Sequence, residues 1–249
     1  MGMRMHMVTK SSSLAREHHH SVGEVTERLT EHTREILHEV KPKLRGWLHA
    51  AIAPVTLVAG IVLILRTPSS SVRLGLTVFV ASAVVLFGVS ALYHRRTWSP
   101  RMRDRLRRFD HANIFVHIAG TYTAFSVLLL EPGRAATVLT VVWLATALGV
   151  AFRIWWIDAP RWLHTPAYVA MGLVAVFFSA DFAQHAGSPA LTLMVVGGAL
   201  YLLGALVYGV QRPNPIPRWF GFHEIFHAFT VVAFATHYVG ISVGTQSLV

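Results

Sequence analysis

The sequence predicts an all-α membrane protein with seven transmembrane helices, and three observations lead to this fold class. First, 53% of the 249 residues are hydrophobic and only 14% are charged, whereas about 25% charged residues is usual in a soluble domain. Second, seven apolar segments have the length of about 20 residues that a helix needs to cross a bilayer. Third, no segment alternates apolar and polar residues as a membrane strand does, so helices are the only expected spanning structure.

The chain is expected to consist of a polar cytoplasmic tail, residues 1–46, and a transmembrane domain, residues 47–249. In the tail, apolar residues recur at near-helical spacing from Val22 to Val40, which predicts a short amphipathic helix on the membrane surface. Short linkers rich in Pro, Ser and Arg separate the spans of the transmembrane domain. The seven spans are expected at Trp47–Leu65, Leu74–Tyr93, Asp110–Leu130, Ala135–Phe152, Trp162–Ala180, Ala190–Val210 and Phe222–Val243.

Positive charge is distributed unevenly between the two ends of these spans. Nineteen of the 22 Lys and Arg residues lie in the tail and in the linkers on its side, and three lie on the other side. Because cytoplasmic loops carry the excess of Lys and Arg, this predicts a cytoplasmic N-terminus and an outside C-terminus, in the inner (plasma) membrane. The net charge of +10 then indicates anionic lipid headgroups as partners, and no nucleic-acid motif accompanies it.

Two histidines one helical turn apart begin the seventh expected span. His223 and His227 lie on one face of a helix, at the spacing by which a helix offers two nitrogen ligands to one zinc ion. Ionisable groups inside a membrane span are costly without partners, so their default interpretation is functional. The chain has no cysteine, which excludes thiolate ligands.

The expected topology brings further polar residues to the same depth. The second span ends near the cytoplasmic surface with Ser90 and His94 on one face, and the third span begins there with Asp110. Three imidazoles, from His94, His223 and His227, with an open fourth position are the ligand set of a catalytic zinc site. Asp110 is expected to hold and deprotonate the attacking water, with Ser90 as a supporting hydrogen-bond partner.

Three other interpretations of these residues stay open. The segment from His223 to His227 also matches a metalloprotease pattern with Glu224 as general base; Glu224 points about 100° away from His223 and would otherwise pair with a loop arginine. Histidines on facing helices also ligate haem, although a neighbouring aspartate and serine favour a hard metal ion. Finally, neighbouring side chains alone can satisfy such histidines without any metal.

Three further histidines are expected to have other roles. His117 lies about 10 Å deeper than Asp110 and should line a cavity or form a hydrogen bond across helices. His237 lies about 15 Å along the last span from His227 and should sit near the outer surface. His111 is expected to point away from the helix face that carries Asp110.

The sequence resembles the bacterial hemolysin III family in three segments that occur in the same order within residues 43–249. These are Ser90-x-x-x-His94, the run Phe109-Asp110-His111-Ala112-Asn113, and His223-x-x-x-His227. The family is related to the progestin and adiponectin receptor (PAQR) family and to alkaline ceramidases. The resemblance implies seven helices and a zinc ion held by the three histidines, with Asp110 and Ser90 beside it. In the first span His49 is retained, but Pro42 and Arg45 stand where family members often have an acidic residue and an asparagine.

We therefore expect a zinc-dependent, hydrolase-like protein that acts on a lipid amide or ester, as ceramidases do, and contributes to membrane lipid homeostasis. Its partners would be membrane lipids and a lipid-like small-molecule substrate. One alternative is a non-enzymatic membrane sensor or receptor whose zinc only joins the second, third and seventh spans. The other is cytolysis through a pore, which we rank last because a compact bundle with few internal charges has no obvious conducting path.

Overall fold

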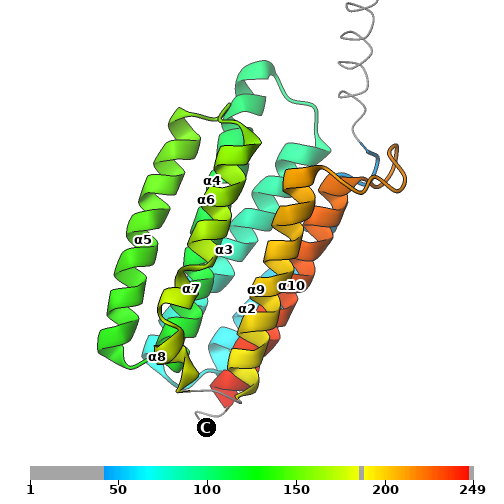
Figure 1. Cartoon of the computed structure of the whole chain (residues 1–249). Coiled ribbons are helices and arrows are strands. Elements are labelled where there is room, and N and C mark those ends of the chain that lie inside the picture. Colours follow the sequence, from blue (N-terminus) through cyan, green and yellow to red (C-terminus); the bar gives the residue numbers. More distant parts are fainter. Residues whose placement is uncertain (1–41, 185–187, 247–249) are drawn as a thin grey trace, which may run out of the picture. The chain divides into compact units, whose positions relative to one another are not determined.

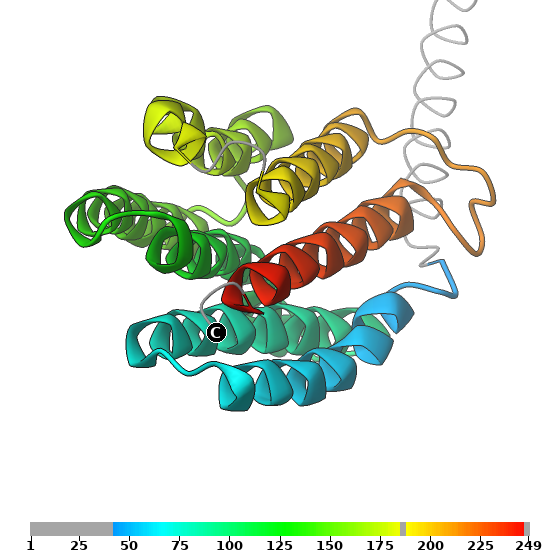
Figure 2. The same ribbon diagram turned by 90° about the horizontal axis from the view of Figure 1, so that it is seen from below.

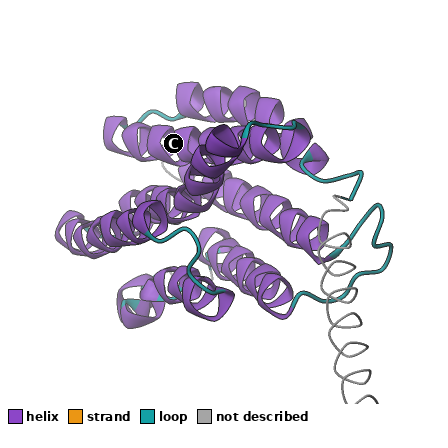
Figure 3. Ribbon diagram, turned by 90° about the horizontal axis from the view of Figure 1, so that it is seen from above, coloured by secondary structure: helices purple, strands orange, loops and turns teal. Residues whose placement is uncertain are grey.

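The computed structural model describes residues 42–184 and 188–246, and all the regular secondary structure in these residues is helical (Figure 3). Six of the helices are long and apolar enough to cross a membrane, so the protein is a multi-pass helical bundle (Figure 1). The predicted amphipathic helix of the tail lies outside the described residues. The six long helices are α2 (Trp47–Arg66), α3 (Ser70–Arg95), α4 (Pro100–Leu129), α5 (Pro132–Trp155), α9 (Pro189–Val210) and α10 (Phe222–Gln246).

Helix α4 begins earlier than the sequence predicted. It starts at Pro100 rather than at Asp110, because proline is well suited to the first turn of a helix and no helix-breaking residue follows it. The arginines between these two positions therefore belong to the helix. Asp110 consequently lies almost three turns inside α4 instead of at its first residue.

The fifth expected span, Trp162–Ala180, is not one continuous helix. The chain forms three short helices in its place, α6 (Arg161–Gly172), α7 (Val174–Phe177) and α8 (Ser179–Ala183). The phenol of Tyr122 on α4 lies at the first break, donating to the Gly172 carbonyl (2.7 Å) and accepting from the Ala175 amide (2.8 Å). A break within a membrane needs such a partner, because lipid cannot hydrogen-bond the freed backbone groups.

Helix α4 is the central helix of the bundle. It has the largest buried share among the six long helices, and it packs against α3, α5, α6 and α10. Figure 2 looks along the helices and shows α10 between α9 and the α2–α3 pair. Glycines allow close contact between the helices. A Cβ added at Gly120 would lie 2.3 Å from the Ser82 hydroxyl, and one added at Gly149 would lie 2.6 Å from the Phe115 ring. Such close fits replace the hydrophobic driving force that lipid does not provide.

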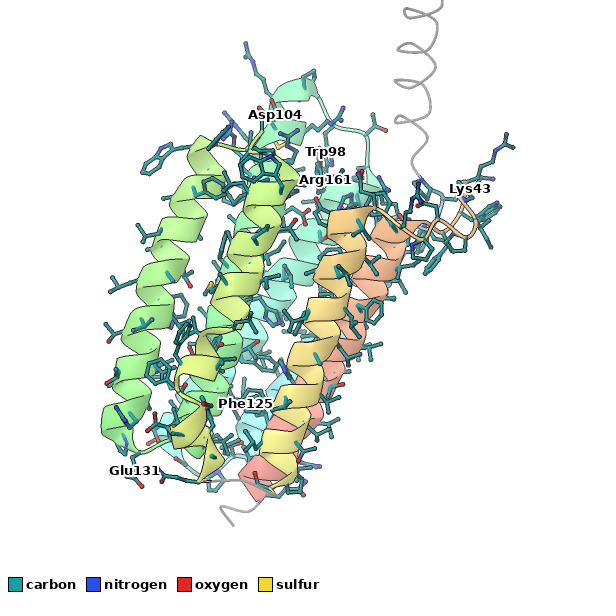
Figure 4. The ribbon with its side chains drawn as sticks, in the orientation of Figure 1. Lys43, Trp98, Asp104, Phe125, Glu131 and Arg161 are labelled. Carbon is teal, nitrogen blue, oxygen red and sulfur yellow. The ribbon has the colours of Figure 1, made fainter. Side chains whose placement is uncertain are left out.

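The outer faces of the helices are apolar, and their ends carry charged and aromatic groups. Leu65, Leu148 and Phe177 are 76%, 74% and 86% exposed, which is the pattern of a surface in contact with lipid. At the end where α2, α4, α6 and α10 begin, the Arg95 guanidinium lies 3.6 Å from the centre of the Trp47 ring. Figure 4 labels Lys43, Trp98, Asp104 and Arg161 at this end and Glu131 at the opposite one. Tryptophan and basic residues together are typical of a headgroup region.

Candidate metal centre

Three histidines that the sequence singled out meet at one point. His94 lies in the last turn of α3, and His223 and His227 lie in the first two turns of α10. One ring nitrogen from each lies within 4.8 Å of the others, and the Nε2 atoms of His94 and His223 are 3.2 Å apart. Two nitrogens held about 2.0–2.1 Å from a tetrahedral ion lie about 3.3 Å apart. The donor set therefore fits a metal ion.

The start of α10 is held by side chains that accept hydrogen bonds from its first amides. Asn214 Oδ1 accepts from the Phe222 amide (2.9 Å), and Glu224 Oε2 accepts from the Gly221 amide (2.8 Å). The first amides of a helix have no partner inside the helix, so these acceptors stabilise the turn that carries His223.

Glu224 is fully engaged in this structural role. Its side chain is 1% exposed, and its second oxygen accepts from Arg45 Nε at 2.9 Å. Arg45 lies in the loop before α2, so the expected pairing of Glu224 with a loop arginine is confirmed. This ion pair ties the loop before α2 to the first turn of α10.

Asp110 and Ser90 lie beside the three imidazoles. Asp110 Oδ2 is 3.6 Å from His94 Nε2, and Ser90, one turn before His94, is buried and lines the same cavity as Asp110. Asp110 is not one of the three grouped ligands. A carboxylate at this distance is placed to bind a water or a substrate atom next to the imidazoles.

His49 joins the cluster as a fourth imidazole that sequence reasoning left in doubt. Its ring stacks on His227 with 3.9 Å between centroids and an interplanar angle of 7°. The side chain is buried, and neither ring nitrogen has a hydrogen-bond partner. Its position in the first turn of a span, at the depth of the other histidines, was the available signal in the sequence.

Gly46, the residue before α2, positions the first helix against His94. Its φ is +80°, and an added Cβ would lie 2.9 Å from the His94 Cβ. Glycine is therefore required both by the left-handed backbone and by the contact with a candidate ligand.

Replacing Gly46 by alanine should destabilise the protein by about 1–3 kcal/mol, because the new methyl group adds a clash to a strained backbone. The same change should weaken metal binding by displacing His94. Thermal unfolding with and without added zinc measures both effects. Gly88→Ala on α3 is the matched control, since nothing lies within 4 Å of its added Cβ. Equal unfolding temperatures for the two variants would contradict the prediction.

A buried arginine lies behind His111. Arg153, in the last turn of α5, is 1% exposed, and its Nη2 donates to His111 Nδ1 at 2.6 Å. Its Nε and Nη1 have no partner. The sequence grouped Arg153 with the charges of a linker, which is wrong for this residue. Because arginine only donates, the neutral His111 ring accepts at Nδ1 and carries its proton on Nε2.

One cavity of about 380 Å³ adjoins the cluster and extends along the bundle. Its walls include Asp110 and His111, although His111 was expected to point away from the Asp110 face. His117 also lines it and lies 3.1 Å from the Ser82 hydroxyl and 3.2 Å from the Tyr201 hydroxyl, which confirms its expected role. His237, expected about 15 Å along the span from His227 and near the outer surface of the membrane, is a buried part of the cavity wall.

Comparison with known proteins matches the helices that carry this cluster. The family model described as Haemolysin-III related matches residues 37–238. The chain is 30% identical over 155 residues to a Hemolysin-3 homolog of Bacillus subtilis (strain 168), covering 62% of this chain and 70% of that protein. It is 24% identical over 207 residues to Hemolysin-3 of Bacillus cereus, covering 83% and 91%. It is 26% identical over 186 residues to the adiponectin receptor protein of Drosophila melanogaster, covering 66% and 41%.

Proposed function

We propose that this chain, which belongs to the haemolysin III-related family, is a zinc-dependent hydrolase that cleaves a lipid amide or ester. One observation carries the proposal: three imidazoles meet beside a carboxylate, and two of them line a mostly apolar cavity together with that carboxylate. His94, His223 and His227 would hold the ion, and imidazole ligands with a carboxylate nearby suit zinc. A zinc ion bound there would lower the pKa of water and polarise a carbonyl group.

The side chains around the cluster supply the remaining chemistry. Asp110 takes a proton from the attacking water as the water oxygen bonds to the substrate carbonyl carbon. It returns the proton to the leaving amine or alcohol as the C–N or C–O bond breaks, which releases a carboxylic acid. Ser90 orients the carboxylate, and His111, with Arg153 behind it, donates a hydrogen bond to a polar oxygen of the substrate.

The cavity accounts for the lipid nature of the substrate. A volume of about 380 Å³ lies within the range of about 300–1,000 Å³ usual for small-molecule sites. Its wall offers leucine, isoleucine, valine and phenylalanine side chains to an acyl chain, and its polar groups gather at a few points. A role in membrane lipid homeostasis follows from such an activity.

We also propose the topology that such a site requires. Helices α6, α7 and α8 together make the fifth of seven crossings, between α5 and α9. The polar tail, residues 1–46, then faces the cytoplasm, the C-terminus lies outside, and the histidine cluster opens toward the cytoplasmic side of the inner membrane. The basic residues and tryptophans at the end where α2 begins support this orientation.

The direct test uses purified protein in lipid nanodiscs. Elemental analysis should find about one zinc ion per chain, and labelled ceramides or phospholipids should be hydrolysed in proportion to the zinc content. A protein that contains no divalent metal, or one that is fully loaded with zinc and turns over neither lipid class, would contradict the proposal.

Glu224→Gln separates this chemistry from that of a metalloprotease. We expect the exchange to destabilise the protein by about 1–3 kcal/mol, because it disturbs a buried ion pair and a helix cap. Turnover by the folded, zinc-loaded protein should stay within about threefold of wild type, whereas loss of a general base costs 10²-fold or more. Arg45→Gln is the matched control, since it breaks the same ion pair from the other side. A loss of turnover confined to the Glu224 variant would make Glu224 the base.

A second candidate function is a membrane sensor in which the ion is structural. It is favoured by the unpaired ring of His49, because a fourth imidazole would close the coordination sphere as in structural zinc sites. Cytolysis, suggested by the name of the Bacillus cereus relative, ranks third. Dye release from liposomes tests it, and we expect no leakage at high protein-to-lipid ratio.

A further inference from the structure

The cavity has a second group of polar side chains, well away from the histidine cluster. His237 on α10, Tyr201 on α9 and His117 on α4 all line the cavity. The rings of Tyr201 and His237 lie 5.5 Å apart between centroids, and those of His117 and Tyr201 lie 6.4 Å apart. His237 follows His227 by ten residues on the same helix, which places it about 15 Å farther along.

His237 presents an unpaired acceptor in this group. Its Nε2 lies 3.0 Å from the Met194 carbonyl oxygen, so Nε2 carries the proton and donates it. The neutral ring is then an acceptor at Nδ1. The His237 side chain is only 5% exposed, and its Nδ1 atom is buried and has no hydrogen-bond partner. A buried acceptor without a donor costs free energy, so the site is built for a group that donates.

The contact with α9 directs the unpaired nitrogen away from that helix. An added Cβ at Gly197 would lie 2.2 Å from His237 Cδ2 and 2.4 Å from Nε2. The Cδ2–Nε2 edge of the ring therefore packs into the space that glycine leaves on α9. Nδ1 is on the opposite side of the ring, away from this contact.

Tyr201 is an acceptor as well. The Ser82 hydroxyl donates its one proton to the Phe79 carbonyl (2.8 Å), so Ser82 can only accept from His117 Nδ1 (3.1 Å). His117 Nε2 is then unprotonated and accepts from the Tyr201 hydroxyl at 3.2 Å. The Tyr201 oxygen has committed its proton and keeps a free lone pair.

The geometry points to a second binding subsite in this cavity, where His237 and Tyr201 accept a hydrogen bond from a hydroxyl group in the distal half of an acyl chain. Both groups have a free acceptor, and their protons are already used in the bonds to Met194 and His117, so a keto or ether oxygen at the same place finds no donor. The subsite rests on the proposed function only in requiring that the cavity hold a lipid chain. The subsite adds a substrate class to that function: lipids whose acyl chain carries a hydroxyl group about 15 Å from the histidine cluster.

Four fatty acids of equal length test the subsite on the unmodified, zinc-loaded protein. We expect 12-hydroxyoctadecanoic acid to bind roughly tenfold more tightly than octadecanoic acid, as one added hydrogen bond to a buried acceptor allows. The 12-keto acid should bind no better than octadecanoic acid. Moving the hydroxyl to carbon 2, far from His237, should remove the advantage. Isothermal titration calorimetry in nanodiscs measures all four affinities.

His237→Phe keeps a ring of similar shape against Gly197 and removes the acceptor. The variant should bind 12-hydroxyoctadecanoic and octadecanoic acid with equal affinity. Its affinity for octadecanoic acid should equal that of wild type. Thr236→Val is the matched control on the same helix, because the Thr236 hydroxyl bonds only to its own helix. Equal binding of the hydroxylated and plain acids by wild type overturns the subsite alone. Failure of every fatty acid to bind overturns the lipid cavity as well.

Discussion

Replacing Asp110 by asparagine should abolish lipid turnover and leave the metal in place. Asparagine keeps the size of the side chain but cannot take a proton from water. General-base catalysis contributes about 10²–10⁴-fold to a rate, so we expect a loss of that size in hydrolysis of labelled ceramide. Because the three imidazoles are unchanged, elemental analysis should still find about as much zinc as in wild type.

Asp104→Asn is the control for this experiment. Asp104 lies on the exposed first turns of α4, away from the cavity wall (Figure 4), and its exchange removes the same charge from the same helix. It should leave turnover unchanged. Wild-type turnover in the Asp110 variant would exclude Asp110 as the base. Loss of zinc from that variant would instead make Asp110 a ligand.

Replacing His227 by alanine should remove zinc binding almost entirely. Two remaining imidazoles hold the ion far more weakly than three, and we expect at least a 100-fold lower affinity, since even a residue that only supports a ligand costs 10–100-fold. Zinc stabilises a protein that binds it when folded, by about 2.7 kcal/mol at 100 times its Kd. Added zinc should therefore raise the unfolding temperature of wild type and not that of the variant.

His49→Gln is the informative comparison for the His227 variant. If the ion has three ligands and an open position, this exchange should leave zinc content near wild type, because His49 only stacks on His227. An equal loss of zinc in both variants would indicate a closed site with four imidazoles, and the sensor function would then gain over the hydrolase. Unchanged zinc affinity in the His227 variant would contradict the proposed ligand set.

The positions of the six long helices were predictable because each depends on a continuous apolar segment of its own. The meeting of His94 with His223 and His227 was also predictable, since span ends at one membrane surface share one depth. The orientation of Glu224 followed from helical geometry, which separates it from the His223 face by about 100°.

The features that sequence reasoning missed involve partners far apart in the chain. The break between α6 and α7 is matched by a phenol from Tyr122, 50 residues before Gly172. Arg153 looks like a linker charge, yet it is buried beside His111, 42 residues away. The stacking of His49 on His227 joins the first and last long helices.

The sequence by itself determined the membrane class, the approximate helix limits and the residues of the histidine cluster, because these depend on local composition and on spacing along one helix. Only the tertiary structure decided which side chains complete the site and where one expected span breaks. The reason is that hydrogen bonds such as those of Tyr122, His111 and His237 depend on how each helix is rotated and shifted against its neighbours. That arrangement comes from the packing of all the helices together.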